Sequence, residues 1–335
     1  MATSEQVREA LGGVLLLEPR RSLAELNMVR DIKIAEDQVK VALALTALSD
    51  AAKQRIQERV QSAIEKLPGV REAVIDLVEL PPRELNQIGH VIAVMSGKGG
   101  VGKSVVAALL AIGLNRNGYQ VGILDADLTG PSIPMMFGLK ARPMSSESAL
   151  LPVSTRSGIE VMSLNLLLPH EDDAVIWRGP LLAKVITQFW QDVVWGKLDY
   201  LIVDLPPGTA DIPLTVMQTL SLSGLVIVFT PQELAAMVVK KAVGMAYKLN
   251  VHILGVVENM SYFLLPESGK RIELFGPSKG EEMSLEAGAP LLGRLPIDPE
   301  LARLCDSGQI ERYNSEAVTA LSQAFAQVMP ALAHA

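Results

Sequence analysis

The stretch VIAVMSGKGGVGKS, residues 91–104, decides the fold of this chain. Its first five residues are apolar, four glycines follow in the turn, and an apolar stretch of helix length comes next. The spacing Gly97-x-x-x-x-Gly102-Lys103-Ser104 is typical of a phosphate-binding loop between a strand and a helix. Glycines let backbone N–H groups approach a phosphate closely, and the helix N-terminus adds positive potential. The stretch therefore predicts a nucleoside triphosphate site.

Each part of this turn has an expected contact with the nucleotide. We expect Lys103 to reach the β- and γ-phosphates and the Ser104 hydroxyl to bind Mg²⁺. The loop residues predicted to bind the nucleotide are Gly97, Lys98, Gly99, Gly100, Val101, Gly102, Lys103 and Ser104.

A second interpretation of the same glycines is a dinucleotide-binding turn. Gly97-x-Gly99-x-x-Gly102 fits that fingerprint, and Asp125 lies at a suitable distance in sequence to bind a ribose. Lys103 and Ser104 directly after the last glycine favour the triphosphate, because a dinucleotide turn does not need them.

Composition narrows the class of protein. At 335 residues, the chain is long enough for two domains, and 49% hydrophobic residues supply a sizeable core. The net charge of −7 gives no basic surface for nucleic acid, and we expect no nucleic-acid partner. No apolar run reaches membrane-spanning length, and no signal peptide is apparent. With one cysteine, Cys305, the chain has no disulfide framework. We expect a cytoplasmic protein with no membrane partner.

The sequence predicts two domains. Residues 1–80 are expected to form a small α+β domain, 81–89 a proline-containing linker, and 90–335 an α/β domain with a doubly wound, mostly parallel sheet. Strands are expected in the small domain at 29–34, 39–45 and 70–80, and in the large one at 91–95, 120–125, 159–163, 199–204, 225–230, 251–257 and 289–294. Helices are expected at 4–16, at 50–66 with Asp50 as the N-cap, at 105–114 and at 315–332.

Two predicted strands of the large domain end in acids. Asp125 and Asp127 follow one strand, and Asp204 ends another. Acids at the carboxyl end of a parallel strand lie beside the ligand crevice. Asp127 is placed to orient or deprotonate an attacking water, although it could equally be a turn acid. Asp204 can hold Mg²⁺ together with Ser104.

The residues after Asp204 form a second expected contact with the nucleotide. In the segment Pro206-Pro207-Gly208, the glycine can direct its N–H at the γ-phosphate. A mobile segment at 204–211 could then report hydrolysis to the rest of the molecule.

Lys98 has no evident contact to make with the nucleotide of its own chain. A lysine directly after the first loop glycine cannot easily fold back on its own nucleotide. It could reach a phosphate across a twofold interface, which would make a homodimer part of the active site. The alternative is a solvated surface lysine.

Several blocks together resemble the Mrp (ApbC) family, within the MinD/ParA-like class of P-loop NTPases. The loop GKGGVGKS is similar to the family's deviant Walker A motif, and further matching blocks cover most of residues 90–300. These are DLTGPSIP (127–134), WRGP (177–180), WGKLDYLIVDLPPGT (195–209), TPQ (230–232) and VENMS (257–261). Residues 1–80, with LNMVRD (26–31) and LPGV (67–70), resemble the small domain of SufT-type iron–sulfur assembly proteins.

The resemblance implies a homodimeric ATPase that carries iron–sulfur clusters to apoprotein clients. It implies that Lys98 contacts the partner's nucleotide, that Asp127 acts in hydrolysis and that Asp204 serves Mg²⁺. It also implies that Asn259 recognises adenine, a role for which the residues alone give no argument.

The chain departs from the family at the expected cluster ligands. The family usually places Cys-x-x-Cys just after Asn-Met-Ser, and here Leu265 and Ser268 occupy those positions. Asp50 stands where the small domain commonly has a cysteine. A four-iron cluster needs about four thiolates, whereas a dimer with one cysteine per chain supplies two.

Three hypotheses follow from the sequence. The first is a slow, dimer-dependent ATPase of the iron–sulfur carrier type that uses ATP and Mg²⁺ and lacks the usual cluster ligands. The second is an ATP-gated scaffold that recruits assembly proteins and carries no cluster. The third is a positioning ATPase on membrane or DNA, against which the acidic composition and the absence of Lys and Arg from residues 315–332 argue.

Overall fold

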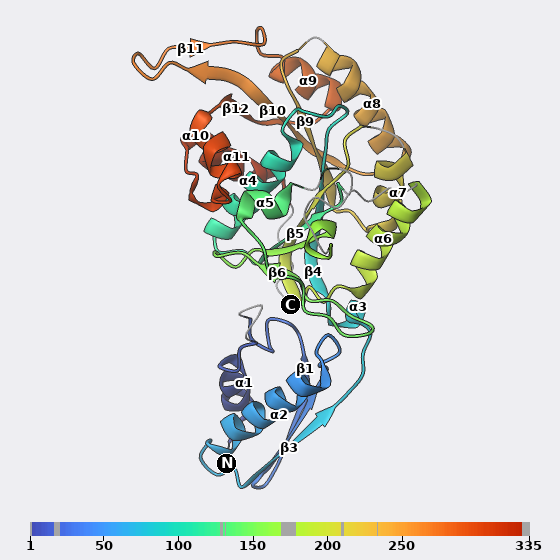
Figure 1. Ribbon diagram of the computed structural model, residues 1–335, viewed down its shortest axis with the longest axis vertical. Helices are drawn as coiled ribbons and strands as arrows, with labels where there is room; N and C mark the ends of the chain where they lie inside the picture. Colours follow the sequence, from blue (N-terminus) through green and yellow to red (C-terminus); the bar gives the residue numbers. More distant parts are fainter. Residues whose placement is uncertain are drawn as a thin grey trace. The chain divides into compact units, whose positions relative to one another are not determined.

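The computed structural model describes residues 2–16, 21–127, 130, 132–168, 179–208, 211–232 and 234–329. The chain divides into two compact units (Figure 1). The first contains residues 1–88, 142–154 and 188–198, and the second contains the remainder. This division differs from the predicted domains, because residues 142–154 and 188–198 join the N-terminal unit. Their buried Leu151 and Val194 belong to the hydrophobic core of that unit.

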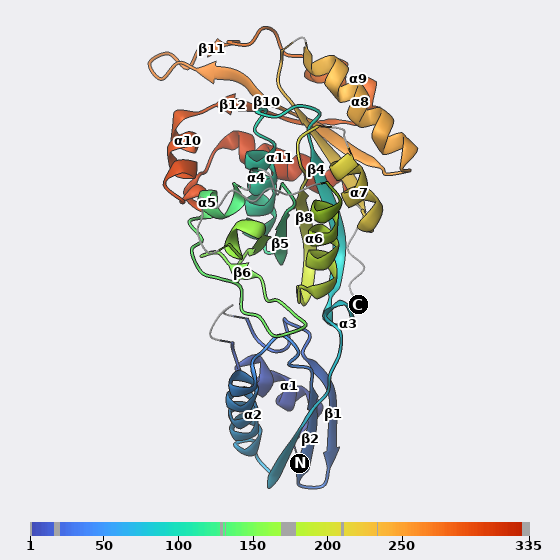
Figure 2. The same ribbon diagram turned by 45° about the vertical axis from the view of Figure 1, so that its right-hand side comes forward.

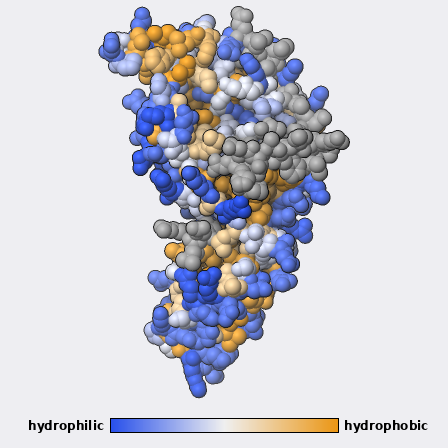
Figure 3. All heavy atoms as spheres, viewed as in Figure 1, coloured by the Kyte–Doolittle hydropathy of each residue, from blue (hydrophilic) through white to orange (hydrophobic). Residues whose placement is uncertain are grey.

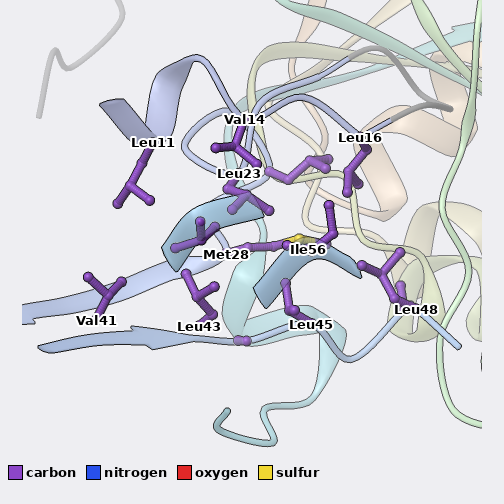
Figure 4. Close-up of a cluster of buried hydrophobic side chains, with 14 of the residues drawn as sticks. Leu11, Val14, Leu16, Leu23, Met28, Val41, Leu43, Leu45, Leu48 and Ile56 are labelled. Carbon is purple, nitrogen blue, oxygen red and sulfur yellow. The ribbon is translucent and has the colours of Figure 1, made fainter. Parts of the chain in front are cut away.

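The first unit is a three-stranded sheet packed against helices. Its strands have the order β1-β2-β3, with β1 antiparallel and β3 parallel to β2. The apolar face of α2 and the inward side chains of the strands meet in one core, in which Leu23, Leu43 and Ile56 lie close together (Figure 4). The elements are α1 (Ser4–Gly12), β1 (Val29–Ala35), β2 (Gln38–Leu43), α2 (Asp50–Glu65), β3 (Glu72–Leu77) and α3 (Pro82–Leu85).

Two details of this unit differ from the sequence prediction. Helix α1 ends at Gly12, four residues earlier than expected. The prediction of Asp50 as the N-cap of α2 is wrong, because Ser49 holds the extended cap position and Asp50 is the first helical residue. An acid in the first helical turn interacts favourably with the helix dipole, so its preference for this place does not require it to be the cap.

The second unit is built on a mostly parallel sheet. Within the described residues the chain forms a nine-stranded sheet in which β4 lies between β9 and β8. Pairing is parallel from β4 through β9 and β10 to β12, and from β8 through β5 to β7, whereas β11 is antiparallel to β10. The strands are β4 (Gln87–Met95), β5 (Val121–Asp125), β7 (Glu160–Ser163), β8 (Lys197–Asp204), β9 (Gly224–Phe229), β10 (Ile253–Leu264), β11 (Arg271–Ile272) and β12 (Leu291–Ile297). The two-residue strand β6 (Val153–Ser154) ends the segment 142–154, which is counted with the first unit.

Helices cover both faces of this sheet. Figures 1 and 2 show α4, α5 and α11 on one face and α6, α7 and α8 on the other. This arrangement confirms the predicted α/β class. The helices are α4 (Lys103–Arg116), α5 (Ile133–Phe137), α6 (Gly179–Asp192), α7 (Asp211–Thr219), α8 (Leu234–Lys248), α9 (Gly280–Ala287), α10 (Pro299–Asp306) and α11 (Glu316–Val328), with 3₁₀ turns at Leu164–Leu166 and Ile310–Arg312. No described helix is long and apolar enough to cross a membrane.

Strand β10 is longer than predicted. It continues seven residues past the expected end at 257, and Met260 adopts a left-handed φ of 55° within it. The pairing of β10 with β12 shifts register between Glu258 and Tyr262. The charged Glu258 and the polar Asn259 interrupt the apolar pattern at this irregularity, which is why the pattern alone ended the strand at 257.

Candidate functional site

The glycine-rich turn lies between β4 and α4, as predicted. Strand β4 ends at Met95 and helix α4 begins at Lys103. Gly100 and Gly102 adopt φ values of 81° and 78°, which residues with a Cβ rarely adopt. The Ser96 hydroxyl donates a hydrogen bond to the Lys98 carbonyl at 3.0 Å, which holds the turn together. The turn therefore has the backbone shape of a phosphate cradle that opens into a helix N-terminus.

Lys103 is the centre of the polar cluster behind this turn. Its side chain is 6% exposed, and its Nζ lies 2.5 Å from Oδ1 of Asp204 and 3.7 Å from Oδ2 of Asp127. The same nitrogen lies 3.3 Å from the hydroxyl of Ser104. The carboxyl ends of β5 and β8 thus bring both predicted acids to the loop lysine.

Asp204 is completely buried, and burial raises its pKa, while the charge and hydrogen bond of Lys103 and the Ser104 hydroxyl oppose that rise. Its Oδ2 atom has no hydrogen-bond partner among the residues that the structure describes. A buried, unpartnered carboxylate oxygen beside a serine hydroxyl fits a hard, oxygen-seeking cation such as Mg²⁺. Among described residues no cluster of three or more His, Cys, Asp or Glu side chains could hold a metal, so phosphate oxygens and water would have to complete such a site.

The carboxylate of Asp125 is enclosed within the protein and bonded there. It is fully buried, accepts a hydrogen bond from the Ser163 hydroxyl at 3.0 Å on Oδ2 and accepts one from the Asp127 N–H at 3.2 Å on Oδ1. Burial, followed by the charge of Asp204, raises the pKa of Asp125 well above its usual value. Both oxygens are engaged inside the protein, which argues against the ribose contact that a dinucleotide site would require.

Asn259 lies directly against the phosphate loop. Its amide nitrogen donates a hydrogen bond to the Val101 carbonyl at 2.8 Å. A Cβ added to Gly102 would lie 2.2 Å from the same nitrogen. The irregular part of β10 therefore closes one side of the turn, and the absence of a side chain at Gly102 is what allows this approach.

Gly208 also lies beside the loop, with a φ of 93°. Its N–H donates a hydrogen bond to the Ser96 carbonyl at 2.9 Å, so in this structure it bonds to loop backbone. Contact with a γ-phosphate would require this bond to be exchanged. The next two residues of the predicted relay segment, 209 and 210, lie outside the described residues, as do 177 and 178 of the WRGP block.

Lys98 is exposed at the outer side of the turn. Its amine forms no salt bridge with any residue in the described part of the chain, in contrast to the buried Lys103. The two loop lysines therefore face different environments. Lys103 faces the acids of its own chain, and Lys98 is available to a group outside it.

Leu265 and Ser268 lie in the turn that joins β10 to β11. The Leu265 carbonyl accepts a hydrogen bond from the Gly269 N–H at 2.8 Å, and its N–H donates to the Lys270 carbonyl at 3.0 Å. Apolar side chains gather over this hairpin (Figure 3), and among the exposed ones are Leu264, Leu274 and Phe275. The single cysteine, Cys305, lies in α10, outside this turn.

Sequence reasoning missed two residues that shape the site. Ser96 closes the phosphate turn, and Ser163 supports Asp125. Both are polar residues at the carboxyl ends of buried strands, β4 and β7. The same position, at the carboxyl end of a buried strand, had identified the acids of the site, so it could also have identified these two serines.

Models of two protein families match the chain. The model for a ParA-type family described as NUBPL iron-transfer P-loop NTPase matches residues 87–333. A model described as iron–sulfur cluster assembly protein matches residues 4–75. The two matches follow one another along the chain, as the resemblances of the two halves had predicted.

Curated relatives agree with these models. The iron–sulfur cluster carrier protein of Synechocystis sp. is 39% identical, over 97% of this chain and 98% of the relative. The protein of the same name from Clostridium perfringens is 49% identical, over 68% of this chain and 83% of the relative. The predicted Mrp-type resemblance is confirmed.

Solved structures confirm the fold of the second unit. A nucleotide-binding protein from Archaeoglobus fulgidus in complex with ADP is 46% identical, with a TM-score of 0.65, over 76% of this chain and 98% of that one. The cell division ATPase MinD of Pyrococcus furiosus has a TM-score of 0.52 at 22% identity, over 72% of this chain and all of that one, and supports the fold alone.

Proposed function

The chain belongs to the iron-transfer P-loop NTPases of the iron–sulfur cluster carrier family, and we propose from this that it is a slow ATPase that works as a homodimer in iron–sulfur cluster assembly. The observation that carries the proposal is the position of Lys103. Its amine lies between two acids, behind a glycine turn with the backbone shape of a phosphate cradle.

The residues of the turn would bind the phosphates of ATP. Backbone N–H groups of residues 97–102 and the start of α4 supply the positive potential, and Lys103 neutralises the β- and γ-phosphates. Ser104 and Asp204 would hold Mg²⁺, which neutralises charge on the transferred phosphoryl group. We assign contact with the adenine base to Asn259, whose amide nitrogen donates a hydrogen bond to the Val101 carbonyl.

Hydrolysis requires an oriented water molecule. Asp127 follows β5, and its Oδ2 lies 3.7 Å from the amine that would contact the γ-phosphate. We assign it the role of orienting that water and accepting its proton. The Gly208 N–H, now on the Ser96 carbonyl, would exchange to the γ-phosphate and so relay the state of the nucleotide to the segment 204–211.

In the proposed homodimer, the exposed Lys98 would take part in catalysis at the site of the facing protomer. An amine at this position can contact the nucleotide of a facing protomer and stabilise the charge that develops on the β-phosphate of the leaving ADP. ATP would then close the interface and hydrolysis would loosen it. We also propose apoprotein clients as partners, and a cytoplasmic location for a chain with one cysteine.

The variant Lys103→Ala tests the ATPase proposal. We expect turnover of Mg·ATP to fall by about a hundredfold or more, because one charge contact to the transition state is worth several kcal/mol. A Lys98→Ala variant should lose turnover and retain ATP binding. Lys248→Ala, a change at an exposed lysine in the last turn of α8, serves as the matched control. Equal turnover in wild type and Lys103→Ala would refute the catalytic assignment.

A second candidate function is an ATP-gated scaffold that carries no cluster. The observation in its favour is that Leu265 and Ser268 carry no thiol at the two positions in the β10–β11 turn where the family resemblance implies cysteines. Anaerobic reconstitution, followed by iron and sulfide assay, separates the two functions. A stoichiometric cluster that transfers to an apoprotein supports the carrier, and protein without bound iron and sulfide supports the scaffold.

A further inference from the structure

A polar cavity of about 1150 Å³ lies within the first unit. Three parts of that unit form its walls: the start of α2 with the residues before it, the segment 79–83 that leads from β3 into α3, and the loop 145–148 with the end of α6. Its floor is apolar, with the buried Leu48 and Pro82. None of these residues belongs to the phosphate turn, and the proposed ATPase function makes no use of them.

The charged side chains on the cavity walls carry a net negative charge. Lys53 and Asp50 form an ion pair, with Nζ 3.5 Å from Oδ1. The charged residues that remain are three acids, Glu79, Glu147 and Asp192, and one base, Arg83. None of the three acids forms a salt bridge with any residue in the described ranges. Burial in the wall of the cavity raises the pKa of Asp192. The cavity therefore attracts a positively charged ligand.

A polypeptide fits this cavity better than an ion or a small molecule. The volume exceeds the roughly 300–1000 Å³ of small-molecule pockets, and no described cluster of acids could hold a metal. The chain also enters the cavity directly from β3, which ends at Leu77, two residues before Glu79. The outer edge of β3 pairs with no described strand, so its backbone groups are available to an added strand.

We infer that this cavity, continued along the free edge of β3, binds an extended, positively charged segment of a partner protein. Backbone groups of β3 would hold the main chain of that segment, and the three acids would pair with its lysine or arginine side chains. This assigns the N-terminal unit the role of recognising partners, separate from nucleotide binding.

Fluorescence anisotropy with labelled model peptides tests the inference on the full-length protein. The probe is a short peptide of alternating lysine and threonine, and the control is the same peptide with glutamate in place of lysine. The triple variant Glu79→Gln, Glu147→Gln, Asp192→Asn should bind the lysine peptide about tenfold more weakly or worse, because it removes the charge complementarity. Arg83→Gln should bind it more tightly.

A matched control variant carries the same change of charge away from the cavity. It replaces three exposed acids of the first unit, Glu5, Glu9 and Glu58, with glutamine, and should bind the lysine peptide as the wild type does, with circular dichroism confirming the fold of both triple variants. Lys103→Ala should bind the lysine peptide as well as the wild type does, so the outcome of this test does not depend on the ATPase proposal. Equal binding of both peptides, an unaffected cavity variant, or no binding of the lysine peptide by wild type would overturn the inference.

Discussion

The amine of Lys103 lies 2.5 Å from Oδ1 of Asp204, and both side chains are buried. Phosphate oxygens that enter the turn compete with Asp204 for this amine. The carboxylate released by that competition is the one that we propose faces Mg²⁺. Binding of phosphate by the lysine and of Mg²⁺ by the acid are therefore coupled through one ion pair.

The variant Asp204→Asn tests this coupling. Without the acid, Lys103 has no competitor for phosphate, so a fluorescent ADP analogue should bind about as tightly in EDTA as in Mg²⁺, and ATP turnover should fall about a hundredfold or more. The measurement is the ratio of dissociation constants with and without Mg²⁺. Asp76→Asn, which removes an exposed acid of β3 paired with Lys40, is the control and should leave the ratio unchanged. An Mg²⁺ effect of wild-type size in Asp204→Asn would contradict the assignment.

A side chain at Gly102 should disrupt the nucleotide site more than the backbone strain alone explains. In Gly102→Ala the new Cβ would meet Asn259 Nδ2 at 2.2 Å, and the residue would also have to hold a left-handed φ. Gly118→Ala is the matched control, because Gly118 has a φ of 90° and no atom within 4 Å of its added Cβ. Both variants should lose about 1–2 kcal/mol of folding stability from strain. Only Gly102→Ala should weaken binding of the fluorescent ADP analogue, by about tenfold or more. Equal affinities in the two variants would show that the contact with Asn259 is unimportant.

The sequence predicted the site where the spacing of residues carries geometric meaning. The loop pattern placed Lys103 at a helix N-terminus, and the acids after two strands placed Asp127 and Asp204 beside it. Parallel strands end at the same edge of a sheet, so this juxtaposition follows from topology alone. Most strand positions were predictable for the same reason, since buried parallel strands are continuous apolar runs.

What the sequence did not predict depends on contacts between distant segments. The addition of residues 142–154 and 188–198 to the first unit rests on side chains such as Val194, whose apolar character does not indicate which core it enters. Asn86 shows the same limit, because its amide bonds the Val193 carbonyl at 2.9 Å and the Trp195 N–H at 2.7 Å. A local pattern cannot identify a partner more than a hundred residues away.

The packing of α4 against α11 depends on a glycine. A Cβ on Gly113 would lie 1.8 Å from the Ser322 hydroxyl oxygen and 2.9 Å from its Cβ. Although alanine favours helix formation by up to about 1 kcal/mol, overpacking costs about 1–3 kcal/mol, so Gly113→Ala should lower the free energy of unfolding. Gly244→Ala in α8, where the added Cβ meets no atom within 4 Å, should raise it by about 0.5–1 kcal/mol. Urea unfolding measures both.

A second-site change separates the clash at Gly113 from other effects. Ser322→Gly removes the side chain that the new Cβ would meet, so the double variant should recover most of the stability that Gly113→Ala loses relative to Ser322→Gly alone. A double-mutant cycle gives the coupling energy, which we expect to be about 1–2 kcal/mol. A coupling energy near zero would place the effect elsewhere in α4.

The thiol of Cys305 should be unreactive at neutral pH. Burial, followed by the nearby charge of Asp306, raises its pKa to about 11, from an ordinary value of 9.0. At pH 8 the thiolate fraction should be about a hundredfold lower than in an unshifted thiol, so alkylation by iodoacetamide should be correspondingly slow. The rate should keep rising through pH 10 and reach half of its plateau only near pH 11. Unfolded protein in urea provides the control, and a midpoint near pH 9 in the folded protein would be incompatible with the burial argument.

Cysteines at the family's usual positions should restore cluster binding to the β10–β11 turn. Leu265 and Ser268 lie in one turn, closed by the bond from the Gly269 N–H to the Leu265 carbonyl. In the proposed homodimer, Leu265→Cys with Ser268→Cys provides four thiolates, about the number that a four-iron cluster needs. We expect the double variant to bind iron and sulfide stoichiometrically on anaerobic reconstitution, with the absorption spectrum of a cluster. Leu264→Cys with Glu267→Cys has the same spacing and number of thiols, shifted by one residue away from the family's positions. That control should bind substantially less. Equal loading of both variants would indicate non-specific uptake, and no loading of the first would mean that the turns of two chains do not meet.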